Sequence, residues 1–312
     1  MVIVVGSLNM DLVIRAPKIP RPGETILGSD FKQVSGGKGA NQADAAAKLG
    51  TETIMLGAVG NDSMGKRLKD SLERDGVNVQ MVLEKDDSPT GVAAIVVEDS
   101  GNNAITVAPG ANSGFSSKDL LQMENAFKGA DVMLVQLETP LDTVKTALKL
   151  AKKNNVTTIL NPAPAMNLDD EIYTLVDVLT PNETELELLS NMETDTSEKV
   201  EAAGRLLLEK GVSELVVTLG SQGSMHIGKD FSQIYPAYKV KAVDTTAAGD
   251  SFNAALAVSL ANGSTMEESI LFATKVGAMT VTKHGAQTSL PLLQEVEQFE
   301  KWYEKLKLKE ER

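Results

Sequence analysis

The sequence predicts an α/β fold in which helices cover both faces of a central, mainly parallel β-sheet, with a small antiparallel sheet beside it. Short apolar runs such as residues 2–5, 132–135 and 215–217 are typical of parallel strands that are buried on both faces. From Ser116 onward, such runs alternate with helix-like segments across short connections, which is the pattern of a parallel sheet. Earlier in the chain, stretches rich in proline and glycine indicate antiparallel strands instead.

The N-terminal part of the chain mixes these two patterns. Elements of the main sheet are expected as a strand at 2–5, a helix at 39–49 ended by Gly50, a strand at 53–58 and a helix at 64–74. Shorter strand-like pieces, broken by prolines and glycines or joined by a hairpin turn at 99–102, are expected at 12–14, 25–27, 31–34, 90–97 and 104–107.

We interpret the two stretches of antiparallel character, about 12–34 and 90–108, as a lid lying across a ligand site. Apolar residues occupy both parities of residues 92–97, so neither face of that strand is expected to be solvated. A second subunit would then cover one face, which predicts a homodimer. An ordinary extension of the main sheet is the alternative. In both cases we expect a single domain of residues 1–312.

The remaining chain reads as regular alternation of helix and strand. Helices are expected from 117, at 141–152, 183–189 and 199–210, from 249 and at 266–282, with strands at 132–135, 157–160, 176–179 and 215–217. A polar amphipathic helix follows from 292, and residues 305–312 look frayed. A closed eight-fold barrel is the alternative fold, but the antiparallel insertions and uneven spacing fit it less well.

Composition limits the classes of function. The chain has 312 residues, 42% hydrophobic and 23% charged, as in ordinary globular proteins, and its net charge of −13 argues against general binding to nucleic acid or anionic membranes. It has no cysteine, which excludes disulfides and thiolate chemistry, and only His226 and His284 could serve a histidine site. No apolar run approaches the roughly 20 residues of a membrane span, and residue 1 leads directly into a strand, so we expect a cytoplasmic location.

The strongest functional signal lies in residues 243–255. Small residues lead into Asp250, and apolar residues at helical spacing follow, so a helix is expected to begin near Gly249. The free amides at its start, from Ala247 to Asp250, would attract an anion, and the small side chains would let it approach closely. The negative charge of Asp250 would repel such an anion, so its presence there needs a reason. A role as the base beside a transferring phosphoryl group would supply one. Helix capping by Asp244 or Asp250 is the alternative.

Other polar motifs have both a functional and a structural interpretation. Asn9, Asp11 and Glu138 follow apolar strands and could converge on the hydroxyls of a sugar, or could merely cap strand ends. The glycines of residues 35–41 surround Lys38, which suits either a phosphate or polar-ligand cradle or a tight turn. Residues 182–185 form a capping box, and the glycine-rich turn at 218–223 suits a flat base or ribose.

A P-loop-like stretch at residues 60–67 is not expected to bind phosphate. A P-loop ends in Ser or Thr, which holds magnesium, whereas this stretch ends in Arg67. Asp62 or Ser63 is expected instead to cap the following helix.

Taken together, the motifs resemble the ribokinase (PfkB) carbohydrate-kinase family. Residues 244–257 resemble its C-terminal signature and residues 35–42 its N-terminal signature. Segments 6–11, 136–140, 161–164, 180–185 and 283–287 also match the family, in its order, so the resemblance spans nearly the whole chain.

The resemblance implies a three-layer sandwich with a β-sheet lid, and transfer of the γ-phosphoryl group of ATP to O5 of D-ribose. Asp250 would be the base, with Ala247, Ala248 and Gly249 supplying amides for the developing charge. The implied sugar contacts are Asn9, Met10, Asp11, Gly37, Lys38, Gly39, Ala40, Asn41, Glu138 and Asp250. The implied nucleotide contacts are Asn182, Thr218, Leu219, Gly220, Ser221, Gln222, Gly223, Gly249, Asp250 and Thr274, the last replacing the family's usual His or Asn.

Two cations are implied as well. Glu185 would orient Mg²⁺ through water. A K⁺ site, formed mostly by main-chain carbonyls, would involve Asp244, Thr246, Thr280, Lys283, Gly285 and Ser289.

Three alternatives to this function remain. The first is a kinase for deoxyribose, fructose or a nucleoside. The second is a non-catalytic sugar- or nucleotide-binding regulator, although such a protein has no use for the intact Gly249-Asp250 pair. The third, an NAD-dependent dehydrogenase, would need a G-x-G-x-x-G motif after the first strand, where this chain has Gly6-Ser7-Leu8-Asn9.

Overall fold

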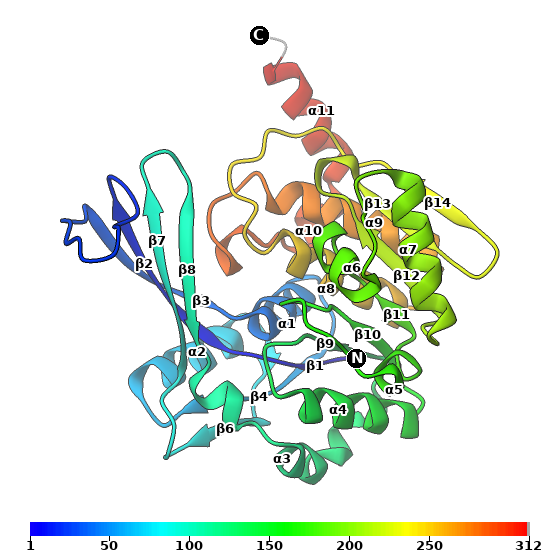
Figure 1. Cartoon of the computed structure of the whole chain (residues 1–312), viewed down its shortest axis with the longest axis horizontal. Helices are drawn as coiled ribbons and strands as arrows, with labels where there is room; N and C mark the ends of the chain where they lie inside the picture. The colour runs from blue at the N-terminus through cyan, green and yellow to red at the C-terminus, as the bar shows by residue number, and fades with distance from the viewer. Residues whose placement is uncertain (311–312) are drawn as a thin grey trace.

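The computed structural model describes residues 1–310, and its centre is a ten-stranded sheet (Figure 1). The strands are β1 (Val2–Val5), β4 (Thr53–Gly60), β5 (Val77–Asn78), β6 (Val82–Lys85), β9 (Val132–Val135), β10 (Thr157–Leu160), β11 (Val178–Leu179), β12 (Glu214–Thr218), β13 (Ser224–Ile227) and β14 (Ser232–Tyr235). They follow the order β14-β13-β12-β11-β10-β9-β1-β4-β5, with β6 also paired to β4. Only the β12-β13 and β13-β14 pairs are antiparallel, so the sheet is mainly parallel, as predicted.

Helices cover both faces of this sheet and form a three-layer sandwich. One face carries α1 (Lys38–Lys48), α2 (Ser63–Arg74), α8 (Ala248–Ala261), α9 (Met266–Thr280), α10 (Leu293–Glu297) and α11 (Phe299–Glu310). The other carries α3 (Ser117–Gln122), α4 (Leu141–Lys153), α5 (Asp170–Tyr173), α6 (Glu183–Ser190) and α7 (Ser197–Glu209). In β1, Val2 and Val4 join the first apolar cluster while Ile3 and Val5 join the second, because successive side chains point to opposite faces.

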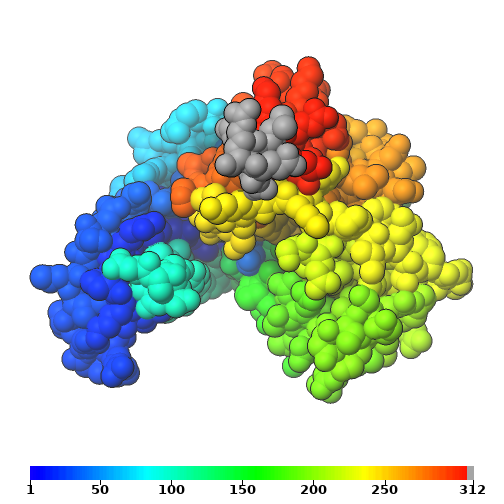
Figure 2. Space-filling view, turned by 90° about the horizontal axis from the view of Figure 1, so that it is seen from above, coloured from blue at the N-terminus to red at the C-terminus, as the bar shows by residue number. Residues whose placement is uncertain are grey.

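A second, four-stranded sheet stands apart from the first. It consists of β2 (Asn9–Ala16), β3 (Asp30–Gly36), β7 (Gly91–Glu98) and β8 (Asn103–Ala108), in the order β3-β2-β7-β8. The pairs β2-β3 and β7-β8 are antiparallel, and a parallel pairing of β2 with β7 joins them. Figure 2 shows this sheet as an arm separated from the rest of the molecule by a hollow. The alternative of an extended main sheet is therefore wrong.

Several predicted boundaries differ from the structure. Residues 25–27, expected as a strand, are irregular. A turn bond from the Glu24 amide to the Arg21 carbonyl precedes them, and the Ser29 amide after them donates to the Arg15 carbonyl of β2. Leu27 between these bonds is 90% exposed, so its side chain is not packed against the fold. The strand expected at 176–179 is shortened to β11. The amphipathic helix expected from 292 is divided into α10 and α11. Of the stretch expected to be frayed, residues 305–310 are helical and 311–312 lie outside the described residues.

The P-loop-like stretch is a helix cap, as predicted. Asp62 Oδ1 accepts a hydrogen bond from the Gly65 amide at 2.8 Å, and Oδ2 accepts one from the Thr90 amide at 2.8 Å. Both oxygens of this N-cap are thus committed to the protein backbone. A hollow of about 700 Å³ lies beside it, but carboxylates in its wall, including Asp70, Glu73 and Glu84, oppose a phosphate ligand. Across residues 1–310, no helix has both the length and the apolar character needed to cross a membrane.

Candidate active site

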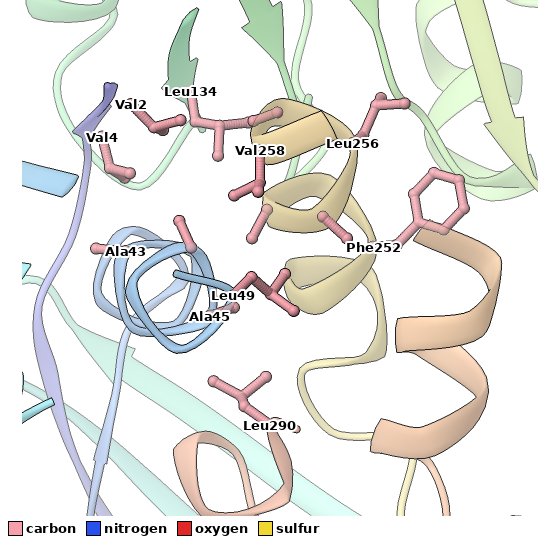
Figure 3. Close-up of a cluster of buried hydrophobic side chains, with 14 of the residues drawn as sticks. Val2, Val4, Ala43, Ala45, Leu49, Leu134, Phe252, Leu256, Val258 and Leu290 are labelled. Atoms are coloured by element: carbon pink, nitrogen blue, oxygen red, sulfur yellow. The ribbon is translucent and has the colours of Figure 1, made fainter. Parts of the chain in front are cut away.

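Asp250 lies in the first turn of α8. Figure 3 shows this helix packed beside α1. The α8 residues from Asp250 to Ser259 are all buried. Small side chains at the contact, such as Ala43 and Ala46 of α1 and Ala254 of α8, are completely buried. They let the two helix backbones approach closely. Side chains from α1 can therefore reach the start of α8.

The carboxylate of Asp250 is held by two amide side chains of α1. The residue is only 7% exposed. Asn41 Nδ2 donates to its Oδ2 at 2.9 Å, and Gln42 Nε2 donates to its Oδ1 at 3.1 Å. Burial raises the pKa of Asp250, while the charge of Lys38 and these two hydrogen bonds oppose the rise. The carboxylate is thus held by hydrogen bonds in an environment that raises its affinity for a proton.

The amides at the start of α8 are mostly free. Ala247, the N-cap, has a left-handed backbone with φ of 59°, which is unusual for a residue with a side chain. Within the described residues, the amides of Ala247, Gly249 and Asp250 have no acceptor. We expected four free amides, but that of Ala248 donates to the Thr245 carbonyl at 3.2 Å, because the αL residue folds the chain into a turn there.

Acidic groups and one lysine converge in front of Asp250. Burial raises the pKa of Asp11 to about 7, and the nearby charges of Glu138 and Asp250 add to the rise. Burial lowers the pKa of Lys38, but the surrounding carboxylates of Asp250, Glu138 and Glu185 outweigh it, and the net shift is upward. Residues far apart in the sequence thus form one cluster of charged side chains beside Asp250.

The neighbours of these residues are tied to the backbone frame. Glu138 Oε2 accepts bonds from the Ser7 hydroxyl and, at 3.1 Å, from the Lys38 amide. Asn9 Oδ1 accepts a bond from Asn112 Nδ2 at 2.8 Å. Asn41 Oδ1 is buried without a partner among the described residues, so this oxygen is available to a ligand hydroxyl.

Some of the residues predicted to contact the sugar have a structural role in the fold. Met10 points to the opposite face of β2 from Asn9 and Asp11, because strand side chains alternate, and it is completely buried in an apolar cluster. Ala40 is also completely buried. Gly37 adopts a φ of 91°, and a Cβ on it would lie 2.7 Å from the Asn9 amide nitrogen. The glycines of this motif therefore allow α1 to start directly against the segment that carries Asn9 and Asp11.

A cavity of about 560 Å³ opens on the other side of the α8 start. This volume is in the usual range for small-molecule sites. Of the predicted nucleotide contacts, the cavity is lined by Asn182, Thr218, Gly220, Ser221, Gly223, Gly249 and Thr274. Leu219, which is 6% exposed, Gln222 and Asp250 are not in its wall. The Thr274 hydroxyl donates to the Ile270 carbonyl at 2.8 Å, so its hydrogen is already committed within α9.

The apolar wall of this cavity was not predicted. It includes Tyr238, Val240 and Phe252. The Tyr238 ring lies 4.5 Å from that of Phe299 and 5.1 Å from that of Tyr303, between ring centroids. Residues 236–242 form no regular element in the structure, and their sequence shows no motif, so only the fold reveals this wall.

Asn182 and Glu185 form the predicted capping box. Asn182 Oδ1 accepts the Glu185 amide at 2.8 Å, and Glu185 Oε2 accepts the Asn182 amide at 2.9 Å. Glu185 Oε1 has no partner among the described residues, so a water of a hydrated Mg²⁺ could still donate to it. Burial raises the pKa of Glu185, opposed by the Asn182 bond and by Lys38. The residues present therefore fit the cation.

The residues expected around K⁺ lie in the segment before α8 and in the segment from the end of α9 to Ser289, which are hydrogen-bonded to each other. Asp244 joins them, since its carboxylate accepts the amides of Thr246 and Gly285, each at 2.9 Å. The side chains of Thr280 and Ser289 donate to carbonyls of their own segments, and Lys283 pairs with Glu295. These side chains are therefore engaged within the protein, which leaves main-chain carbonyls as the groups that could contact a cation here.

A carboxylate beside free helix-start amides, between a cluster of charged side chains and a cavity of small-molecule size, defines a site suited to phosphoryl transfer. Residues 1–293 match the family described as pfkB family carbohydrate kinase. The chain belongs to this family and is a kinase.

Known relatives match over almost the entire chain. It is 41% identical to the ribokinase of Haemophilus influenzae, covering 95% of this chain and 97% of the relative. It is 37% identical to a deoxyribokinase of Salmonella typhi, covering 95% and 97%. A structure of Arabidopsis thaliana ribokinase complexed with ribose and ATP aligns with a TM-score of 0.88 at 33% identity, covering 96% of this chain and 97% of that one.

Proposed function

We propose that the protein phosphorylates D-ribose at O5 with ATP as the phosphoryl donor. The observation that carries this proposal is the position of Asp250. It lies close to the charged side chains of Asp11, Lys38 and Glu138, while its neighbour Gly249 lines the 560 Å³ cavity. The proposal is supported by the 41% identity to a ribokinase and by the likeness to a ribokinase complexed with ribose and ATP.

In the proposed step, the Asp250 carboxylate takes the proton of the sugar's 5-hydroxyl. The oxygen O5 then forms a bond to the γ-phosphorus while the bond to the ADP oxygen breaks. The proton remains on Asp250 until solvent removes it. Asn41 and Gln42 keep the carboxylate pointed at the pocket during this step.

Negative charge on the transferring group would be met by the free amides of Ala247, Gly249 and Asp250. Such preorganised donors usually supply the largest part of the stabilisation of a transition state. Lys38, which carries a raised pKa, would remain charged and add to the positive potential on the sugar side.

Glu185, with Asn182, is proposed to hold a hydrated Mg²⁺ that neutralises charge on the β- and γ-phosphates when ATP is bound. The loops joined by Asp244 are proposed to bind K⁺ through carbonyl groups, which would order the start of α8. Equal activity in sodium and potassium salts would count against the K⁺ proposal.

The four-stranded sheet, about 12–34 and 90–108, is proposed to act as a lid within a single domain, closing over the sugar and excluding water. Its exposed apolar side chains are proposed to form the contact of a homodimer. A kinase that uses ATP is proposed to act in the cytoplasm.

Deoxyribose is the second candidate substrate, because a deoxyribokinase is 37% identical over 95% of the chain. The two sugars differ only in the 2-hydroxyl group. A site whose buried polar groups bind that hydroxyl would discriminate strongly against the analogue that lacks it.

The test is ADP release from ATP and Mg²⁺ with a panel of ribose, deoxyribose, fructose and nucleosides, in potassium and in sodium. We expect the highest kcat/KM with ribose. A higher kcat/KM with another sugar would contradict ribose as the substrate but would leave the proposed phosphoryl-transfer mechanism unchanged. Ribose binding without turnover would instead indicate a regulatory sugar-binding protein.

A further inference from the structure

A chain of buried amide side chains ends on the carboxylate of Asp250. Gln136, which follows β9, donates from Nε2 to Gln42 Oε1 at 2.6 Å. Gln42 Nε2 then donates to Asp250 Oδ1 at 3.1 Å and to Asn161 Oδ1 at 3.2 Å. Gln42 and Gln136 are completely buried. Buried polar groups are usually hydrogen-bonded; both ends of the Gln42 amide are, whereas Gln136 Oε1 has no partner among the described residues.

The hydrogen-bonding pattern fixes the orientation of the Gln42 amide. A carboxylate can only accept hydrogen bonds, so the Nε2 end of Gln42 must face Asp250. Both hydrogens of this nitrogen are then used, and the oxygen at the other end accepts from Gln136. The Gln42 amide therefore has only one orientation in which all its hydrogen bonds are formed.

The same network also holds the backbone around Asp250. Asn161 Nδ2 donates to the Thr180 carbonyl at 3.3 Å, and the Thr180 hydroxyl donates to Asn253 Oδ1 at 2.5 Å. Asn253 Nδ2 donates to the carbonyl of Gly249 at 2.9 Å. The side chain of Asp250 and the peptide just before it are thus linked through one set of neutral groups.

From this geometry we propose that Gln42 is a positioning residue for the proposed kinase reaction: it keeps the Asp250 carboxylate oriented and able to accept the sugar proton. The proposal rests on the proposed function. A neutral donor suits this task, because it offsets burial of the carboxylate without adding a second positive charge beside Lys38, which would weaken the base.

The test is the pH dependence of kcat/KM for ribose in the wild type and in Gln42→Met. Methionine has a similar length but no donor for the carboxylate. A carboxylate that accepts two or three hydrogen bonds can have its pKa lowered by about two units, so the loss of one donor is expected to raise the acid midpoint by about one unit. Activity below the midpoint would then fall about tenfold.

The two proteins compared must have the same charged side chains around Asp250, so none of these residues is substituted. They are Lys38 of α1, Asp11 of β2, Glu138 after β9 and Glu185 of α6. The matched control is Thr143→Val, which removes a buried hydrogen bond of 2.7 Å to the Phe115 carbonyl on the opposite face of the main sheet. The control is expected to lower stability without moving the acid midpoint.

The outcomes separate this proposal from the proposed function. A Gln42→Met profile that superimposes on the wild-type profile overturns the role of Gln42. If Gln42→Met does not fold, Gln42→Glu is used, which keeps the bond from Gln136 and places a second carboxyl group against Asp250. The acid midpoint of kcat/KM in Gln42→Glu should lie above that expected for Gln42→Met, because the second carboxyl group adds charge repulsion to the loss of the donor. A midpoint equal to that of the wild type overturns the proposal.

If the wild type does not phosphorylate ribose, the proposed substrate fails, and the role of Gln42 is then decided without turnover. A ¹³C NMR titration of labelled aspartate, assigned with Asp250→Asn, reads the pKa of Asp250 directly in the wild type and in Gln42→Met. A higher pKa in the variant supports the role of Gln42, and equal pKa values overturn it.

Discussion

Asp250 combines two demands that conflict in most proteins, because a base must be ionised and this one is buried. Burial raises its pKa, and the opposing contributions come from Lys38, Asn41 and Gln42. All three belong to α1, the helix that follows the glycine motif. The chemistry of one residue of α8 is thus set by the first two turns of another helix.

Gly249 offers a sharp test of the anion site. A Cβ at this position would meet no atom within 4 Å, and the backbone is helical, so Gly249→Ala should leave stability unchanged or raise it by about 0.5–1 kcal/mol. We expect kcat to fall at least tenfold, because the methyl group would occupy the space of the transferring phosphoryl group. Steady-state kinetics and thermal unfolding measure the two effects.

The control is Gly277→Ala, a second helical glycine in the cavity wall with the same open surroundings. It should gain similar stability with a smaller loss of kcat. Equal losses of kcat in the two variants would show that Gly249 has no special place at the phosphoryl group.

The raised pKa of Asp11 predicts a cost to stability at high pH. The folded protein keeps this proton up to about pH 7, whereas the ordinary pKa is 3.8. The folded state binds more protons in this window, so stability falls as the pH rises through it. Asp11→Asn should therefore be more stable than the wild type at pH 8 by about 1–2 kcal/mol, allowing for partial exposure, and no more stable at pH 4.

Urea denaturation at the two pH values checks this prediction. Asp99→Asn, in the exposed hairpin turn, is the control and should give no difference between them. A stability gain for Asp11→Asn that is equal at pH 4 and pH 8 would contradict the electrostatic explanation.

At the residue scale, the sequence predicted the groups whose chemistry is unusual for their surroundings. Asp11, Glu138 and Asp250 are carboxylates next to apolar runs, and that contrast is visible without a structure. Gln42 and Tyr238 could not be assigned a role in this way. Their roles depend on contacts with Asp250 and Phe299, residues more than half the chain apart in the first case and in a different element in the second.

At the scale of elements, the buried strands were predicted and several edge strands were not. β1 and β9 are continuous apolar runs, buried at every position, which is a strong signal. β14 is exposed at Ser232, Gln233 and Ile234, so its sequence carries no burial pattern. Such strands form because a neighbour offers an unpaired edge, and this information is absent from the local sequence.

Tyr238, in the irregular segment of the cavity wall, packs against Phe299 and Tyr303 of α11, so the C-terminal helix helps to hold this wall in place. Tyr238→Ala is expected to raise KM for ATP roughly tenfold, the effect of losing one aromatic stacking contact with a base, while KM for ribose stays constant. Phe231→Ala, an exposed aromatic residue outside the cavity, is the control. A rise in KM for ribose alone would contradict this prediction, because it would show that Tyr238 contributes to binding of the sugar and not of ATP.

At the scale of the whole molecule, the projecting sheet is too apolar for a free surface. On one face, Phe31 is 56% exposed and pairs with Ile14 of β2, which is 42% exposed. On the other face, Ile105 of β8, paired with Ile95, is 56% exposed. Exposed apolar patches of this kind mark interfaces. We therefore predict a dimer in light scattering and a monomer for Phe31→Lys.

Leu121→Lys, on α3 in the body of the molecule, is the control, since Leu121 is 54% exposed but lies outside this sheet. It should remain a dimer. A wild-type protein that is monomeric at working concentration would contradict both the predicted dimer and the hypothesis that a second subunit covers one face of the lid.

The most direct test of the whole account is the kcat of Asp250→Asn with ATP and ribose. Asparagine keeps the shape of the side chain but cannot take the proton. The variant should fold, because relief from a buried charge offsets the one hydrogen bond that its amide nitrogen cannot accept from Asn41 or Gln42. We predict a fall in kcat of roughly 10²–10⁴, the usual effect of losing a positioned base. A variant that folds and keeps most of its kcat would contradict the assignment of Asp250 as the base.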